Sequence, residues 1–259
     1  MKSIWLTSLV RAEEEVKKVM AQLKAYGLKP SGHFWEDDLE KLAWIKPRSA
    51  LADKDVVLWA IMGTEEDFQS PALRYGLSLL AITVQAERGA DFPIVVLQLE
   101  GQTVLPEALP TPLKGVDVLP VSGAATGPKL VAKAHRTPQG QKDLAYRLDL
   151  YGNEHIGQWF EVGPGAGAWS GAMFAVSDAE IVFHGIGPKG RLPEKSVLNY
   201  PMKGLKLTLG DKEYTAWAVQ NPLDGETSYF VKVQGFPESI LFGAYTQEDN
   251  SEVFAVSLK

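Results

Sequence analysis

The sequence contains no cysteine. That absence excludes disulfide bonds, thiol nucleophiles and thiolate metal sites, and nothing in the chain requires an oxidising compartment. Histidine is also scarce, because the chain has only His33, His135, His155 and His184, and they are far apart. A zinc site would need at least two of them to meet through the fold. We therefore expect no metal ion, and no cofactor.

The chain also has no long hydrophobic run and no excess of positive charge. No apolar run approaches the roughly 20 residues that cross a bilayer, and Arg11 with the glutamates after it makes the N-terminal segment a poor signal peptide. The 26 basic and 32 acidic residues give a net charge of -6, which repels phosphate backbones. We expect a cytoplasmic protein without a membrane or nucleic-acid partner.

The first half of the chain alternates between short apolar runs and segments with helical spacing. The apolar runs predict strands at Ser3–Val10, Gly32–Trp35, Val56–Met62, Phe92–Leu97 and Val116–Val121. Helical spacing predicts helices at Ala12–Tyr26, Leu39–Ala52 (interrupted by Pro47), Leu73–Glu87 and Lys129–His135. This repeated strand-helix order favours a doubly wound sheet with right-handed connections.

The run Val56–Met62 is apolar at every position. A strand without alternating polar residues is typical of a parallel sheet that helices cover on both faces. We therefore predict a five-stranded parallel α/β domain over residues 1–136, followed by a linker at residues 137–143, where "TPQGQK" has linker composition.

Residues 144–259 show a different pattern, with short segments rich in aromatic and β-branched residues between glycine, proline and asparagine turns. The predicted strands are Tyr146–Leu150, Met173–Val176, Glu180–Phe183, Leu205–Leu209, Tyr214–Val219, Ser228–Val233, Ile240–Phe242 and Val253–Val256. This spacing predicts an all-β domain, either an antiparallel sandwich or a barrel.

Two segments of this second half resemble each other in sequence. "RLDLYGNEHIGQW" at Arg147–Trp159 matches "KLTLGDKEYTAW" at Lys206–Trp217, and "EIVF" at Glu180–Phe183 matches "SILF" at Ser239–Phe242, with an offset of 58 or 59 residues. Either similar hairpins match by coincidence, or an internal duplication has produced two β-units with pseudo-twofold symmetry.

Candidate site residues follow from the predicted parallel sheet. Ligands of open α/β sheets bind beyond the carboxyl ends of the strands, where the strand order reverses. The residues that this rule selects are Thr7, Ser8, Glu36, Asp37, Asp38, Gly63, Thr64, Glu65, Gln98, Glu100 and Ser122. The same residue types also form turns and helix caps, which is a structural explanation for each of them.

The order of elements in residues 1–121 resembles that of Toll/interleukin-receptor (TIR) domains. The stretches that carry the resemblance are "SIWLTS", "ADKDVVLWAIM" and "SPALRYGLSLLAITVQA". In that family the helix after the third strand opens with Ser-x-Trp-Cys-x-x-Glu-Leu. Ser70 and Leu77 match the ends of this motif, whereas Gly76 stands where the family has its glutamate.

The resemblance implies that the NAD-cleaving members use that glutamate at the glycosidic carbon, and a glycine cannot stabilise an oxocarbenium ion. Cleavage by that route is therefore not expected. Other reaction motifs are absent as well: the sequence has no dinucleotide-binding Gly-x-Gly-x-x-Gly after its first strand, no Walker sequence and no Gly-x-Ser-x-Gly. "GPGAGAWSG" at Gly163–Gly171 lies between predicted strands and is read as a hairpin loop.

Three functional hypotheses remain open. The first is a non-catalytic module that binds a partner or senses a nucleotide. The second is an enzyme acting on a nucleotide or nucleoside, with Glu36, Asp37 or Glu65 as base or nucleophile, and with Thr7, Ser8 and Thr64 contacting phosphate or ribose. The third is an assembly subunit without a small ligand, which would bind a protein partner or form a homo-oligomer.

Overall fold

The computed structural model describes residues 2–136, 144–245 and 252–259. The chain divides into two compact units, Met1–Lys142 and Asp143–Lys259. The linker predicted at residues 137–143 lies outside the described residues. Within the described ranges, no helix combines the length and the apolar character that a membrane span requires.

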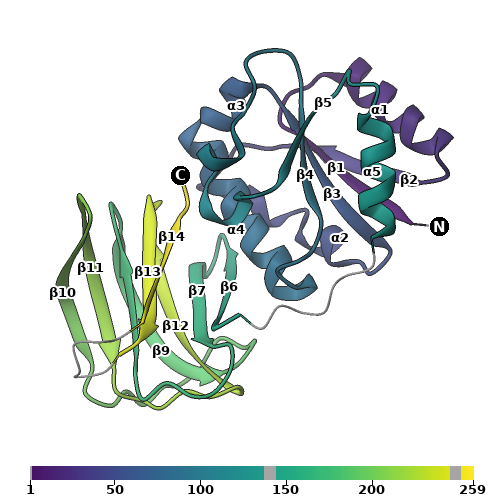
Figure 1. Ribbon diagram of the computed structural model, residues 1–259. Coiled ribbons are helices and arrows are strands. Elements are labelled where there is room, and N and C mark those ends of the chain that lie inside the picture. Colours follow the sequence, from purple (N-terminus) through teal and green to yellow (C-terminus); the bar gives the residue numbers. More distant parts are fainter. Residues whose placement is uncertain (1, 137–143, 246–251) are drawn as a thin grey trace. The chain divides into compact units, whose positions relative to one another are not determined.

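The first unit is an α/β unit built on one parallel sheet, as the sequence predicts (Figure 1). Its strands are β1 (Ser3–Ser8), β2 (Lys29–Phe34), β3 (Val56–Gly63), β4 (Ile94–Gln98) and β5 (Asp117–Pro120). They lie in the order β2-β1-β3-β4-β5, and every neighbouring pair is parallel. This is the strand order of flavodoxin-like sheets.

Helices cover both faces of this sheet, with α1 and α5 on one face and α2 and α4 on the other (Figure 1). The helices are α1 (Glu13–Ala25), α2 (Arg48–Ala52), α3 (Glu65–Gln69), α4 (Pro71–Arg88) and α5 (Thr126–His135), with 3-10 turns η1 (Ala43–Ile45), η2 (Pro106–Ala108) and η3 (Thr111–Leu113). The helix predicted at Leu39–Ala52 is therefore two short pieces, η1 and α2. Pro47 precedes α2 because its ring does not fit inside a helix.

Strand β3 lies in the middle of the sheet, between β1 and β4, and seven of its eight residues are buried. On one face, Leu58, Ala60 and Met62 pack with Val19 of α1 and Leu130 of α5. The uninterrupted apolar run is explained by helices on both sides, so the prediction of a parallel sheet is confirmed.

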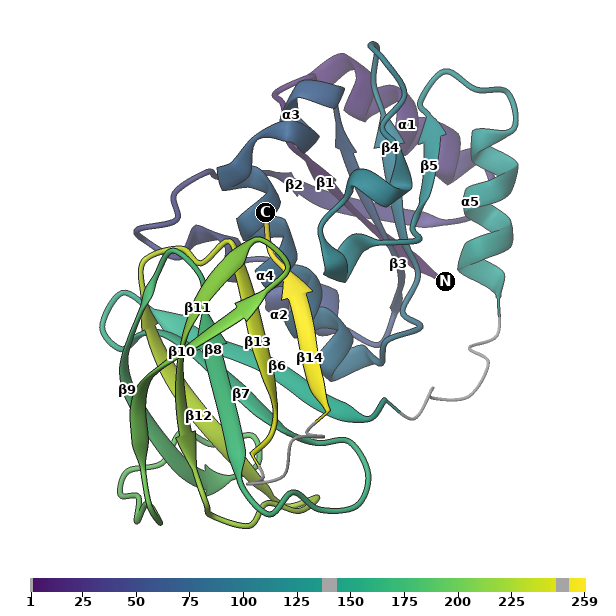
Figure 2. The ribbon, with the colours of Figure 1, turned by 60° about the vertical axis from the view of Figure 1, so that its left-hand side comes forward.

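The second unit is a β-sandwich of two antiparallel sheets (Figure 2). One sheet has the order β6-β7-β12-β9, from β6 (Tyr146–Asn153), β7 (Gly157–Pro164), β12 (Thr227–Gln234) and β9 (Glu180–Pro188). The other has the order β10-β11-β8-β13-β14, from β10 (Met202–Leu209), β11 (Lys212–Val219), β8 (Ala172–Val176), β13 (Ser239–Ala244) and β14 (Val253–Ser257). The sequence analysis missed β7 as a separate strand.

Aromatic rings from both sheets fill the interior of the sandwich. Phe160 of β7 lies 5.2 Å from Phe174 of β8, and Tyr146 of β6 lies 5.0 Å from Phe242 of β13, measured between ring centroids. Phe160, Phe174 and Phe242 are fully buried. Seven of the sixteen aromatic residues of this unit are buried, and they are Phe160, Trp169, Phe174, Tyr214, Tyr229, Phe230 and Phe242.

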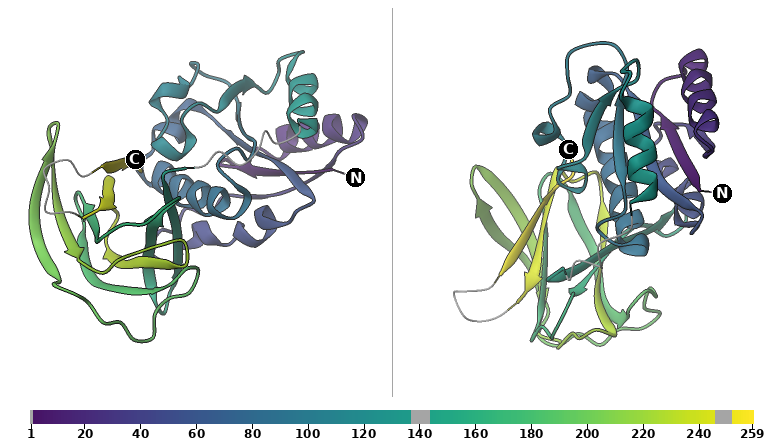
Figure 3. Two further views of the ribbon diagram at one scale, coloured as in Figure 1. Left: turned by 60° about the horizontal axis from the view of Figure 1, so that its bottom comes forward. Right: turned by 45° about the vertical axis from the view of Figure 1, so that its right-hand side comes forward.

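The two sheets are related by an exchange of strands, and Figure 3 shows the ribbon from two further directions. Strands β6, β7, β8 and β9 correspond in order to β10, β11, β12 and β13. When each strand is exchanged for its counterpart, the order β6-β7-β12-β9 becomes β10-β11-β8-β13. This topology agrees with a pseudo-twofold arrangement. In the first sheet, β12 lies between β7 and β9. In the second sheet, β8 lies between β11 and β13.

The matching tryptophans of the two similar segments, however, do not occupy equivalent positions in the sandwich. Phe160 faces the interior, so its neighbour Trp159 faces outward, where it contacts Phe183 of the same sheet. Trp217 faces inward, since its ring lies 4.8 Å from that of His184 in the opposite sheet. The strand order, rather than the tryptophan motif, carries the symmetry.

Candidate functional site

The reversal of strand order in the α/β unit lies between β1 and β3, because the chain runs from β1 outward to β2 and then returns to β3. In sheets of this kind a ligand binds beyond the carboxyl ends of these two strands. Ser8 and Gly63 end β1 and β3. We call the region beyond these strand ends the carboxyl-edge crevice.

The polar side chains at the end of β1 are buried and make hydrogen bonds within the protein. The Thr7 side chain is fully buried, and its hydroxyl accepts a hydrogen bond of 2.8 Å from the indole N–H of Trp59. The buried Ser8 hydroxyl donates to the carbonyl oxygen of Val10 at 2.5 Å. Leu9 follows, and its Cδ1 would lie 2.8 Å from a Cβ atom placed on Gly63. The Leu9 side chain therefore lies against Gly63 at the end of β3.

At the end of β3, Thr64 caps helix α3 in a reciprocal arrangement with Asp67. The Thr64 N–H donates to Asp67 Oδ2 at 2.6 Å, the Thr64 hydroxyl donates to the same oxygen at 2.8 Å, and the Asp67 N–H donates to Thr64 Oγ1 at 3.3 Å. This is a capping box, which satisfies backbone N–H groups at the start of a helix. The Glu65 carboxylate accepts a hydrogen bond from Gln69 at 2.8 Å.

Two of the three carboxylates after β2 form ion pairs with lysines. Glu36 lies 2.5 Å from the Lys46 ammonium. Asp38 lies 3.0 Å from the Lys41 ammonium and also accepts the Lys41 backbone N–H at 3.0 Å. These contacts with Lys41 hold the pKa of Asp38 below its ordinary value. Asp38 is therefore a local cap rather than a general base.

Asp37 is the exception in this group. Partial burial raises the pKa of its carboxyl above the ordinary value, and the negative charge of Asp38 raises it further. Glu65 is not among the charges that shift this pKa. Within the described part of the chain, no hydrogen bond or ion pair joins Asp37 or Glu36 to Glu65. Glu36 and Glu65 thus have different partners, the Lys46 ammonium and the Gln69 amide.

The ends of β4 and β5 add no reactive group to this edge. The Gln98 amide accepts the Val104 N–H at 2.9 Å and donates to the Gln102 carbonyl, so it holds the loop that follows β4. Glu100 and Ser122 are exposed to solvent. Gln98 therefore has a structural role, and Ser122 extends away from the buried edge.

Gly76, on helix α4, lies beneath the Trp35 ring. A Cβ atom placed on Gly76 would be 2.7 Å from Trp35 Cζ2 and 3.5 Å from Leu39 Cδ2. Real Cβ atoms almost never come within 3.0 Å of another heavy atom. The space that a larger side chain at position 76 would need is therefore occupied by an indole.

The histidines do not form a metal centre in the described residues, where no group of three or more histidine, aspartate or glutamate side chains is placed to hold an ion. His33 Nδ1 accepts the Trp5 indole N–H at 3.1 Å, and His184 Nδ1 lies 2.7 Å from the Tyr229 hydroxyl. Burial lowers the pKa of both imidazoles to about 4. Both histidines are therefore neutral at pH 7.

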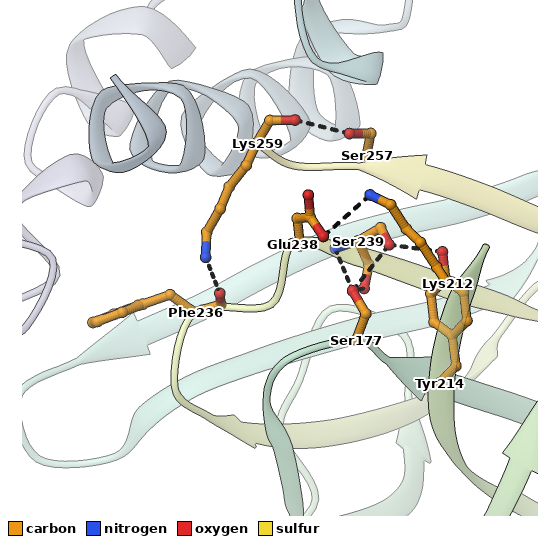
Figure 4. A network of polar contacts seen from close by, with 8 residues as sticks. All are labelled: Ser177, Lys212, Tyr214, Phe236, Glu238, Ser239, Ser257 and Lys259. Carbon is orange, nitrogen blue, oxygen red and sulfur yellow. Dashed lines mark hydrogen bonds and ion pairs between the residues drawn. The ribbon is translucent and has the colours of Figure 1, made fainter. Parts of the chain in front are cut away.

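The sandwich contains a buried cluster of hydroxyl groups, drawn in Figure 4. Ser239 Oγ lies 3.0 Å from Ser177 Oγ and 2.7 Å from the Tyr214 hydroxyl. The nearby Lys212 ammonium is paired with Glu238 at 3.2 Å rather than with a serine. The side chains of Ser177 and Ser239 bond to each other, to the Ser239 backbone and to the Tyr214 hydroxyl, so this cluster joins β11 to β13 and to the residue after β8 (Figure 4).

Sequence reasoning placed the candidate residues at the carboxyl ends of the parallel strands but did not consider the apolar side chains that lie there. Leu9 and Trp35 were not candidates because apolar side chains were not considered there. Asp67 could have been found, since Thr64-x-x-Asp67 at the start of a helix has the spacing of a capping box. Neither a model of a known protein family nor a curated protein sequence matches this chain.

Proposed function

We propose that the α/β unit is a TIR-like module without catalytic activity, which binds a protein partner or senses a nucleotide in the cytoplasm. The sandwich would bind a partner or respond to the state of the α/β unit. The observation that carries this proposal is the Trp35 ring over Gly76, whose Cζ2 atom is 2.7 Å from the point where a Cβ atom of residue 76 would lie. A carboxylate acting from position 76 would need that space.

The side chains of the crevice support the same proposal. Thr7, Ser8 and Thr64 already have hydrogen-bond partners inside the protein. The hydroxyl protons of Ser8 and Thr64 are already donated to Val10 and Asp67, so donating either proton to a phosphate would require breaking that bond, and each buried group left without a partner costs about 1–3 kcal/mol. A binding module that uses other surfaces avoids this cost.

A direct test of catalysis is incubation of the full chain with NAD and with a panel of deoxynucleosides, followed by chromatography for released base. We expect no release above that of a heat-denatured sample. Release that disappears in Glu36→Gln or Glu65→Gln would overturn the proposal, because neither side chain belongs to the buried core.

A nucleotide-binding measurement distinguishes the two proposed forms of the module, a nucleotide sensor and a protein-binding module. A nucleotide at 100 times its dissociation constant stabilises the folded protein by about 2.7 kcal/mol, which thermal unfolding detects. A stabilising nucleotide would favour sensing. A flat response across the panel, together with an oligomer in light scattering, would favour a protein-binding or assembly role.

One observation favours an enzyme as the second candidate. Burial and the neighbouring Asp38 raise the pKa of the Asp37 carboxyl, and carboxyls with a perturbed pKa are frequent at catalytic sites. Asp37→Asn and Asp38→Asn form a matched pair, because each removes one neighbouring charge. Base release that is lost only in Asp37→Asn would support this alternative.

A further inference from the structure

Strand β10 is an edge strand of the five-stranded sheet of the sandwich, as Figure 1 shows. It consists of eight residues, Met202–Leu209, and pairs with β11. In an antiparallel pair, every second residue directs its backbone N–H and C=O groups away from the partner strand. Within the described part of the chain, no hydrogen bond reaches these outward groups of β10. The strand therefore presents free backbone donors and acceptors along its outer side.

The other edge strands of the sandwich are less open. In the four-stranded sheet, the Leu150 N–H of β6 donates to the Asp149 carboxylate at 2.7 Å, and the Ile186 N–H of β9 donates to the Ser196 hydroxyl at 2.6 Å. Strand β14, at the opposite edge of the five-stranded sheet from β10, has only five residues. Short edge strands and occupied N–H groups hinder pairing with another chain. Among these four strands, β10 is therefore the best suited to such pairing.

One face of β10 is apolar. Met202, Leu205 and Leu207 are partly buried, and they pack against a cluster of buried residues in the same sheet that includes Tyr214 and Leu241. Side chains on neighbouring strands stabilise a sheet when they lie opposite each other on one face. Apolar side chains of an added strand would therefore gain contacts on this face.

The other face of β10 carries positive charge. The Lys203 ammonium lies 4.3 Å from the centre of the Trp217 ring, and the Lys206 ammonium donates to the Thr215 hydroxyl at 2.9 Å. The ring and the hydroxyl are neutral, and the described residues contain no ion pair of either lysine, so both keep their charge. Glu213 shares this face, but it lies opposite Thr208, closer to the hairpin turn than either lysine. The field along the start of β10 therefore favours an anion.

We propose that β10 binds an extended segment of a partner protein as an additional strand, and that acidic and apolar side chains alternate along this segment. Backbone hydrogen bonds supply affinity in this mode of recognition, and the alternate side chains supply specificity. The acidic side chains would face Lys203 and Lys206, and the apolar ones would face Leu205 and Leu207. The inference rests on the proposed function in one respect, because it specifies the partner that the sandwich would bind.

The test is fluorescence anisotropy of a labelled peptide in which glutamate and valine alternate over eight residues, the length of β10, titrated with the full chain. One comparison peptide has lysine in place of each glutamate. Another has the same glutamates and valines in two blocks, which keeps the charge but removes the alternation. We expect saturable binding of the alternating glutamate peptide, and binding about tenfold weaker or less for both comparison peptides.

The variant Lys203→Glu/Lys206→Glu reverses the charge of β10. It should weaken binding of the glutamate peptide about tenfold or more and strengthen binding of the lysine peptide. The matched control, Lys54→Glu/Lys129→Glu, makes the same change of net charge at two exposed lysines of the α/β unit and should leave both affinities unchanged. Circular dichroism verifies that each variant is folded.

Two N-methylated forms of the glutamate peptide test the strand pairing itself. One is methylated on the glutamate N–H groups and the other on the valine N–H groups. Only one of these sets faces β10 when the peptide is extended, so we expect one form to bind and the other to fail.

Absence of saturable binding would overturn the proposal and would mean that the lysines only prevent β10 from pairing. Equal binding of the block peptide or of the two methylated forms, or an equal loss in the control variant, would also overturn it, because general attraction of charge would then explain the binding. The base-release experiment tests the α/β unit, so its outcome distinguishes failure of the proposed function from failure of this inference.

Discussion

In the central strand of the α/β unit, side chains are apolar on both faces, whereas the sandwich places polar groups well inside its structure. Strand β3 is buried without a charged residue. In the sandwich, the Glu161 carboxylate is 4% exposed and accepts the Gly190 N–H at 2.9 Å as well as the Tyr151 hydroxyl. His184, Ser177 and Ser239 are also buried there.

The difference follows from how the strands are connected. Helices cover both faces of the parallel sheet, so its central strand carries no charged residue, and the Trp59 indole of that strand donates to the buried Thr7 hydroxyl. Exchange of strands between the two sheets of the sandwich requires long connections, and side chains such as Arg147 hold these in place. The stability of the α/β unit should therefore depend mainly on apolar packing. The stability of the sandwich should depend more on a few polar residues that each make several hydrogen bonds.

The largest expected effect is that of Arg147→Met in the sandwich. The Arg147 guanidinium donates to the carbonyl oxygens of Pro164, Asp224 and Thr227 and to the Ser228 hydroxyl. Removing it leaves several partly buried acceptors without a donor, and we expect a loss of about 3–4 kcal/mol in unfolding free energy. Urea unfolding measures this loss. Arg147→Lys should recover only part of it, because an ammonium lacks the planar fork; equal stability of Lys and Arg would contradict the polar explanation.

The next effect is a loss of stability in acid. The folded-state pKa of His184 is about 4, below its ordinary value of 6.5, so the unfolded chain takes up the proton first as the pH falls. The stabilisation is complete above pH 6.5 and disappears progressively toward pH 4. After allowance for solvent screening we expect about 2 kcal/mol over this window.

Urea unfolding at pH 7, 5.5 and 4.5 checks this window, with His184→Phe for the sandwich and His33→Phe for the α/β unit. Burial lowers the pKa of His33 to about 4 as well, so each variant should have a shallower dependence on pH than the wild type. Parallel curves for wild type and both variants would show that neither histidine is responsible.

A smaller effect is expected for the buried pair in the α/β unit. Thr7→Val keeps the shape of the side chain but leaves the Trp59 indole N–H without its acceptor at 2.8 Å. We expect a loss of about 1.5 kcal/mol, the usual penalty for one buried unsatisfied donor. The double variant Thr7→Val/Trp59→Phe removes both partners, and its thermal unfolding should show less than the sum of the single losses.

The smallest effect concerns the helix cap beside the crevice. Asp67→Ala removes the acceptor for the Thr64 N–H, and we expect a loss of about 1 kcal/mol. Asp67→Asn, which keeps an acceptor oxygen, is the matched control in thermal unfolding. A change of nucleotide binding with no change of stability would instead mean that this side chain serves a ligand.

The fold could be predicted from the sequence wherever a local pattern of residues determines the structure. Uninterrupted apolar runs predicted the buried parallel strands, and Ser70-Pro71 with Gly89 marks the two ends of α4 as a helix cap and a helix stop. Strand β7 was missed because Glu161 lies inside it, and a carboxylate argues against a buried strand until its partners Tyr151 and Gly190 are known.

The candidate site was less accessible, because it depends on contacts between distant residues. Position in the chain placed Glu36, Asp37 and Glu65 near one edge, but β2 and β3 are separated by β1. The contact of Trp35 with Gly76 joins residues that are 41 positions apart.

Interleaving of the sandwich strands has a practical consequence for dissecting the protein. A cut in the connection between β9 and β10 would yield one fragment with β6, β7, β8 and β9 and another with β10, β11, β12, β13 and β14. Neither fragment could assemble a complete sheet, because β7 and β9 need β12 between them, and β11 and β13 need β8. The two pieces would have to fold around each other, so the sandwich offers a natural pair for fragment complementation.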